Sequence, residues 1–204
     1  MNARLLTLAL FLSIFISACT AERNIESGDR IGWQLPSQPL DMQAWPAPDN
    51  LAQRFVFQGE IDNPASQTRL LRYTASDNPE RKLDITLYPI PAGWEDLPPS
   101  RLLGGHYGQV RQHLVERLML AGAREINVDE EQLQLDSELE QPVVSSRFEQ
   151  IFDSQIRVTR VAMTTHGPVF VRAALVVPKD EAELASEVLS NALRDYIGAM
   201  RAQD

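Results

Sequence analysis

Apolar and polar residues alternate along much of the chain, and this period of two predicts β-strands. A first group of predicted strands covers residues 54–61, 68–75 and 82–88, with a turn signal, Asp77-Asn78-Pro79, before the third. A second group covers residues 125–128, 132–135, 143–152, 157–164 and 169–177. Between the last two strands, His166-Gly167 predicts a tight hairpin turn, which favours antiparallel pairing.

Two segments instead have the spacing of amphipathic helices. Residues 105–123 form the first and contain Gly122 near its end, and residues 184–200 form the second. Ahead of the second helix, Asp180 and Glu183 have the D-x-x-E spacing of a helix cap. The order of elements predicts an α+β fold, in which an antiparallel sheet is packed by an internal helix and a C-terminal helix. The apolar face of the first helix consists of Tyr107, Val110, Leu114, Leu118 and Ala121.

The first eighteen residues have the pattern of a secretory signal peptide. A short positive region, residues 1–4, precedes an apolar run at residues 5–16. This run is shorter than the roughly 20 residues that a membrane-spanning helix needs. By itself, this pattern fits either an ordinary secretory signal or an uncleaved membrane anchor.

The run ends in Ile16-Ser17-Ala18-Cys19, which resembles the lipobox of bacterial lipoproteins. The resemblance implies cleavage before Cys19 and attachment of lipid to its thiol, with acyl chains such as palmitate holding the protein on a membrane. In Gram-negative relatives, an Asp after the lipidated cysteine commonly retains the protein in the inner membrane, whereas here that residue is Thr20. The resemblance thus implies the outer membrane, with the protein body in the periplasm; a Gram-positive host would change this to the outer face of the plasma membrane.

Residues 19–50 lack sustained apolar periodicity and contain Pro36, Pro39, Pro46 and Pro48, so they predict a tether. A single globular domain is expected at residues 51–204. Trp33 and Trp45 are unusual in a linker. Either they pack back onto the domain or they dock a partner protein.

Charge narrows the range of partners. The formal net charge of −9 argues against binding to nucleic acid and against long-range attraction to an anionic lipid surface, and it favours basic or neutral partners. Lys82 and Lys179 are the only two lysines in a chain whose other basic residues are arginines. A single cysteine excludes an internal disulfide and a cysteine-ligated zinc site.

The sequence has no catalytic or metal-binding motif that predicts a cofactor or a metal. His106 and His113 are seven residues apart, too far for one metal without a further ligand, and His166 fits a turn. The nucleophile motifs GxSxG and SxxK are absent from the sequence, and Ser145-Ser146 lie in a predicted strand.

Two surface features are candidate binding sites. Gly104-Gly105 ahead of the predicted helix, flanked by Arg101 and Arg111, is a candidate anion site because backbone N–H groups at a helix start attract negative charge. Residues 129–140 are rich in acidic side chains and contain no basic one. They predict either a solvated loop or edge strand protected from aggregation, or an acidic docking surface for a basic partner.

The order of elements, with Tyr-Pro-Ile-Pro-Ala-Gly-Trp at residues 88–94 after the third strand, also resembles the PsbP-like α/β/α sandwich. A fold does not transfer a function. The leading hypothesis is a membrane-anchored envelope lipoprotein that is not an enzyme and binds a protein partner or supports an assembly. The alternatives are a periplasmic module that binds a small ligand or lipid and, third, a hydrolase.

Overall fold

The computed structural model describes residues 34–153 and 155–203. A group of strands, a helix, a second group of strands and a C-terminal helix follow one another, in the order predicted for an α+β fold. The helical elements are η1 (Met42–Ala44), α1 (Pro99–Leu120), η2 (Lys179–Glu181) and α2 (Ala182–Arg201). The strands are β1 (Asn50–Leu51), β2 (Phe55–Asn63), β3 (Thr68–Ala75), β4 (Lys82–Pro89), β5 (Glu125–Asp136), β6 (Gln141–Ile151), β7 (Ile156–His166) and β8 (Val169–Pro178).

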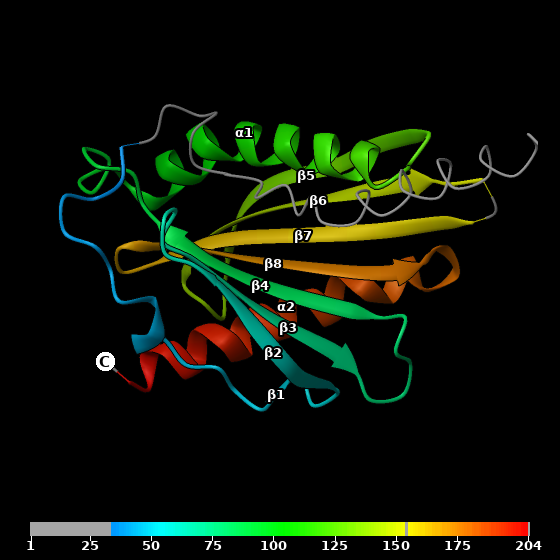
Figure 1. Cartoon of the computed structure of the whole chain (residues 1–204), viewed down its shortest axis with the longest axis horizontal. Helices are drawn as coiled ribbons and strands as arrows, with labels where there is room; N and C mark the ends of the chain where they lie inside the picture. The colour runs from blue at the N-terminus through cyan, green and yellow to red at the C-terminus, as the bar shows by residue number, and fades with distance from the viewer. Residues whose placement is uncertain (1–33, 154, 204) are drawn as a thin grey trace, which may run out of the picture.

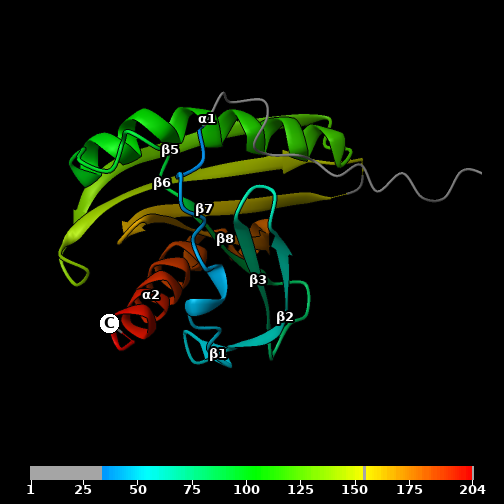
Figure 2. The ribbon, with the colours of Figure 1, turned by 60° about the vertical axis from the view of Figure 1, so that its left-hand side comes forward.

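All eight strands form one sheet in the order β1-β2-β3-β4-β8-β7-β6-β5, and every neighbouring pair is antiparallel. Two meanders therefore meet where β4 pairs with β8. The turn that joins β7 to β8 contains Gly167 with a positive φ of 51°, as the predicted hairpin requires. The sheet curls, and the two long helices lie on opposite faces of it (Figures 1 and 2).

One face of the sheet is closed by α2. Its buried side chains, among them Leu189, Leu193 and Ile197, join the inward residues of β3, β4, β7 and β8 in a single apolar cluster. The inward residues Leu83, Ile85 and Leu87 of β4 have the alternation that the sequence predicted. We call this side of the sheet the closed face.

Residues 34–49, here called the strap, complete the closed face. Met42 is buried in the apolar cluster, and Trp45 packs against that cluster. Arg69 donates from Nη1 to the carbonyl oxygens of Met42 (3.0 Å) and Trp45, and the Tyr196 hydroxyl of α2 donates to the carbonyl of Pro46 (3.0 Å). The predicted boundary at residue 51 is therefore too late, and the part of the predicted tether that the structure describes belongs to the domain.

The other face is only partly covered, because α1 lies over β5, β6 and β7. Leu103, Tyr107 and Val110 of α1 pack on Phe148 of β6 and Phe170 of β8 in a second, smaller cluster. Beyond this cluster no helix of residues 34–153 and 155–203 lies over the same face of β3, β4 and the outer part of β8, and α2 passes behind the strands in Figure 1.

The limits of α1 differ from the prediction. The helix begins at Pro99, six residues earlier than expected, because proline is well suited to a first helical turn. It ends at Leu120, where the N–H groups of Gly122 and Ala123 donate to the carbonyls of Met119 and Leu118. Gly122 has a φ of 96°, so this end is a glycine-terminated C-cap, close to where the sequence placed it.

Two further local predictions are corrected. The strands predicted at 125–128 and 132–135 are one strand, β5, interrupted by a bulge between Asp129 and Gln132 at which Glu130 has a positive φ of 54°. The expected side-chain cap of the last helix is not formed, since α2 starts after the short η2 turn with Glu181 at its N-cap and no side-chain cap hydrogen bond. Within residues 34–153 and 155–203, no helix is long and apolar enough to cross a membrane.

Candidate functional site

The uncovered side chains of the sheet form a surface that we call the open face. They point to the same side as α1, because each is paired in register with the next across the strands. Most are exposed or half-buried, whereas Thr86 and Thr159 are buried. The open face consists of Leu70, Arg72, Thr74, Lys82, Asp84, Thr86, Arg157, Thr159, Arg172, Ala174 and Val176.

The charge of the open face is opposite in sign to that of the whole chain. It carries four cations and a single acid, Asp84, although acidic residues outnumber basic ones by 28 to 19 overall. Asp84 is already paired, because Arg72 donates to its carboxylate from Nε (3.0 Å) and Nη2 (3.1 Å). This surface would attract an acidic partner, while the expectation of basic or neutral partners stays a prediction for the chain as a whole.

Arg172 lies where the open face meets the edge of α1. Its Nη2 donates to Thr86 Oγ1 at 3.1 Å, while its Nε is buried without a hydrogen-bond partner among the described residues. Burial lowers the pKa of Arg172 from its usual value. A half-buried guanidinium with no carboxylate partner in the described chain is costly, so this position attracts a negatively charged group.

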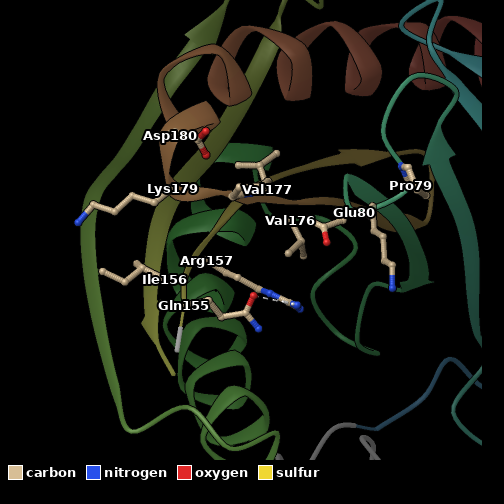
Figure 3. A pocket seen from close by; sticks show the side chains of 11 residues that line it. Pro79, Glu80, Gln155, Ile156, Arg157, Val176, Val177, Lys179 and Asp180 are labelled. Atoms are coloured by element: carbon tan, nitrogen blue, oxygen red, sulfur yellow. Dashed lines mark hydrogen bonds between the residues drawn. The ribbon is translucent and has the colours of Figure 1, made fainter. Parts of the chain in front are cut away.

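One end of the open face is hollowed. The hollow has a volume of about 720 Å³ and is bordered by the β7 and β8 ends and by the turn before β4 (Figure 3). Its cationic residues are Lys82, Arg157 and Lys179. Both lysines of the chain thus line one hollow although they are 97 positions apart in sequence. The remaining lining residues are Pro79, Glu80, Gln155, Ile156, Val176, Val177, Pro178 and Asp180.

Polar side chains also gather beneath α1, but they are buried. His106 is fully buried, 3.1 Å from the Tyr88 hydroxyl through Nε2 and 3.3 Å from Gln109 Oε1 through Nδ1, and its ring stacks at 4.6 Å from that of Phe170. Burial lowers the pKa of His106 to about 4. The hydroxyls of Tyr107 and Ser146 hydrogen-bond to each other. These buried polar groups hydrogen-bond to one another, as polar side chains in a protein core do. The cluster presents no accessible nucleophile of the kind that the hydrolase alternative needs.

The structure does not assemble the predicted anion site around Gly104 and Gly105. Both glycines lie inside α1 rather than ahead of it, so their N–H groups are not at the helix start. Arg101 is exposed on the first turns, and Arg111 pairs with Glu131 of β5 at 2.7 Å. The prediction was wrong because the strong helix-starting signal of Pro98-Pro99 overrides the two glycines.

Trp45 packs back onto the domain, which was the first of its two predicted roles. Its ring meets the His166 ring edge-on at 5.7 Å beside the β7–β8 turn. Trp33 and Cys19 lie outside the described residues.

The acidic run at 129–140 forms edge strand β5 and the turn that follows it, as one of its two interpretations expected. Five of its carboxylates form ion pairs within the domain. They pair with arginines of α1, β6, β7 and α2, so much of their charge is offset within the domain, although all but Asp136 remain partly exposed. The pairs are Asp129–Arg147, Glu130–Arg160, Glu131–Arg111, Asp136–Arg194 and Glu138–Arg194.

Asp136 is the most buried acid of these pairs. Burial alone would raise the pKa of its carboxyl, yet the hydrogen bonds from Arg194 and from the backbone N–H groups of Leu139 and Glu138 lower it. The side chain therefore links β5 to α2. In the part of the chain that the structure describes, no group of three or more His, Cys, Asp or Glu side chains could hold a metal ion.

No family model and no curated protein sequence matches this chain. Among solved structures, it is similar in fold to the solution structure of cyanobacterial PsbP (CyanoP) from Synechocystis sp. PCC 6803. The two share 10% sequence identity, the match covers 66% of this chain and 88% of that chain, and the TM-score is 0.43. This likeness agrees weakly with the expected PsbP-like sandwich, concerns the fold alone, and is too low to bear on function.

Proposed function

We propose that this chain is a lipid-anchored bacterial envelope lipoprotein whose domain is a non-catalytic binding module, and that an acidic segment of a protein partner docks on the open face. The charge of the open face carries the proposal: four cations against one acid in a chain with an acidic excess. Opposite charge on a partner steers its approach and fixes its orientation.

The apolar content of the surface supports a protein partner over a purely ionic one. Val56 and Ile61 on β2 are 39% and 59% exposed, and Ile61 is paired in register with Leu70 of the open face. Protein interfaces combine such apolar contacts with a charged rim. An extended acidic segment with occasional apolar side chains therefore fits this surface best.

The anchor is supported by the lipobox alone, and Cys19→Ser tests it. We expect the variant to lose metabolic acyl labelling and to leave the membrane fraction, because serine offers no thiol for alkylation. Ala18→Ser, which keeps the cysteine after a small residue, is the matched control and should stay labelled. Persistent labelling and membrane retention of Cys19→Ser would refute the anchor.

The docking surface is tested by photo-crosslinking in cells. A photoreactive side chain at Thr74 on the open face should capture one partner, and the same probe at Gln134 on β5 should not. Adding Arg72→Glu, which reverses one charge beside Thr74, should abolish the crosslink at Thr74, and the captured partner should present an acidic segment at the crosslinked site. Equal crosslinks from both positions, or a crosslink at Thr74 that tolerates Arg72→Glu, would contradict the proposal.

A further inference from the structure

We infer that the hollow at the end of the open face is a binding site for an amphipathic phosphate, meaning a phosphate monoester attached to an apolar chain. This inference goes beyond the protein partner proposed above and does not depend on it. The phosphate monoester would come either from a soluble metabolite or from a lipid headgroup, and both sources offer the same chemistry to the hollow.

Two cations in the hollow are placed to share one anionic group. Lys82 is paired in register with Val176, which is paired with Thr159, and Arg157 lies two residues from Thr159 on the same face. This geometry separates their Cα atoms by about 12 Å, a distance that a lysine and an arginine side chain can close around a phosphate. Neither side chain forms an ion pair with any described residue, so both charges are available to a ligand.

The guanidinium of Arg157 is held at the wall of the hollow. It lies 5.9 Å from the centre of the Phe152 ring, and its Nη2 donates to Gln155 Oε1 at 3.4 Å, as the dashed line in Figure 3 marks. An arginine restrained in this way loses less freedom when it binds, and its fork of N–H groups matches a phosphate. Lys179 adds a third charge, although its Nζ is 3.1 Å from Glu149 Oε1.

Apolar side chains form much of the remaining wall. Ile156, Val176 and Val177 line the hollow together with Pro79 and Pro178. In Figure 3 Val176 points toward Arg157, whereas Val177 points away from it and is buried in the apolar cluster of the closed face. A ligand that carried charge alone would leave the accessible parts of Pro79, Val176 and Pro178 in contact with water, whereas an alkyl chain beside the phosphate would bury them.

Two acids border the hollow and limit its affinity. Glu80 belongs to the turn before β4, and Asp180 belongs to η2 just ahead of α2, where the helix dipole stabilises a negative charge. Neither pairs with a cation among the described residues. Because of these acids, a neutral or zwitterionic ligand would compete with the phosphate for the hollow. Glu80→Gln distinguishes the two kinds of ligand, because removing this negative charge should tighten the binding of an anion only.

The experiment titrates four probes against the chain from residue 20 onward, which retains every described residue, and follows backbone amide shifts by NMR. Octyl phosphate tests head and tail together, inorganic phosphate tests the head, and octyltrimethylammonium tests the tail with the opposite charge. Vesicles of phosphatidic acid in phosphatidylcholine test a lipid source. We expect octyl phosphate to shift residues of the hollow and to bind about tenfold or more tightly than inorganic phosphate, the gain from burying two methylene groups.

Variants then locate the site. Lys82→Gln and Arg157→Gln should each weaken octyl phosphate binding about tenfold, Glu80→Gln should tighten it, and Arg101→Gln, an exposed cation on α1, should leave it unchanged. Vesicle binding that depends on Lys82 and Arg157 would assign the lipid source, and its absence with intact octyl phosphate binding would assign the soluble one. Equal binding of octyltrimethylammonium, or octyl phosphate binding that tolerates both Lys82→Gln and Arg157→Gln, would overturn the inference.

Discussion

The two faces of the sheet are built from the same strands yet differ in what covers them. On β4, Leu83, Ile85 and Leu87 point to the closed face and are fully buried, whereas Lys82 and Asp84 point to the open face and meet solvent. The closed face has both α2 and the strap over it, while α1 covers only the β5–β7 part of the other face. Among the described residues, buried apolar packing is therefore concentrated on the closed face, and the docking proposal concerns the side that packs least.

A buried cation marks the closed face as well, but there it is fully used. Arg69 donates to Glu60 as well as to the strap carbonyls, and its hydrogen bond holds the pKa of the Glu60 carboxyl below its usual value. Arg172 is the contrasting case, because it makes one hydrogen bond to Thr86. Arg69 thus satisfies groups on the closed face, whereas the half-buried Arg172 keeps its Nε without a hydrogen-bond partner among the described residues.

The largest loss of stability is expected from a substitution in the core of the closed face. Ile197→Ala removes a fully buried side chain of α2 and should lower the free energy of unfolding by about 4 kcal/mol, since the cavity adds to the lost burial. Urea unfolding measures it. Leu184→Ala on the same helix, where the side chain is 69% exposed, is the control and should change stability by less than about 0.5 kcal/mol. Similar losses in both variants would contradict the packing of α2.

The second largest loss of stability is expected when Arg69, which binds the strap carbonyls, is replaced. Arg69→Ala leaves the carbonyls of Met42 and Trp45 and the Glu60 carboxylate without their donor, which should cost about 3 kcal/mol of unfolding free energy. Hydrogen exchange should also accelerate at Leu40, whose N–H donates to Gln67 in the strap contact. Unchanged exchange there would mean that Arg69 does not hold the strap.

The region under α1 should respond to pH. His106 has a folded pKa of about 4, below the ordinary value of 6.5, so the folded state favours the neutral ring. Its contribution to stability is complete above pH 6.5 and declines as the pH falls toward 4, by about 2 kcal/mol at pH 5. His106→Phe should remove this decline, measured as the difference between the two unfolding free energies across pH 4–7. Parallel profiles for both proteins would contradict it.

The smallest effect belongs to the open face. Arg72→Gln breaks the exposed pair with Asp84 and should change the unfolding free energy by less than about 1 kcal/mol. Its unfolding curve should nearly overlay that of the unchanged protein, which would separate a binding surface from a stabilising one. A loss as large as that of Arg69→Ala would mean that the open face is part of the fold's support.

Much of the fold was predictable from local pattern. The strand at Thr68–Ala75 and the last hairpin followed from alternation and from Gly167, and the C-terminal helix followed from its apolar stripe. The errors fell where two local signals compete. Gly104-Gly105 suggested a helix start that Pro99 supplies earlier, and the bulge at Glu130 made one strand look like two.

The candidate site was much less predictable. Lys82 and Lys179 stood out only as the two lysines of the chain, and Arg157 and Arg172 carried no motif. No spacing rule connects β4, β7 and β8 in advance, because their neighbours are set by the pairing of β4 with β8. The ion pairs of the acidic run could not be predicted for the same reason, since the arginines that pair with it come from four different elements.

Most strands and helices and the α+β class could be predicted from local patterns, because they depend on residues close together in the chain. Lipid attachment at Cys19 stays a prediction. Three other features depend on tertiary packing: the strap belongs to the domain, arginines of other elements pair with the acidic edge, and cations gather on the open face. These features could not be predicted locally because the charge of a surface and the burial of a side chain depend on which strands become neighbours. That choice is made by packing over the whole sheet rather than by any local segment.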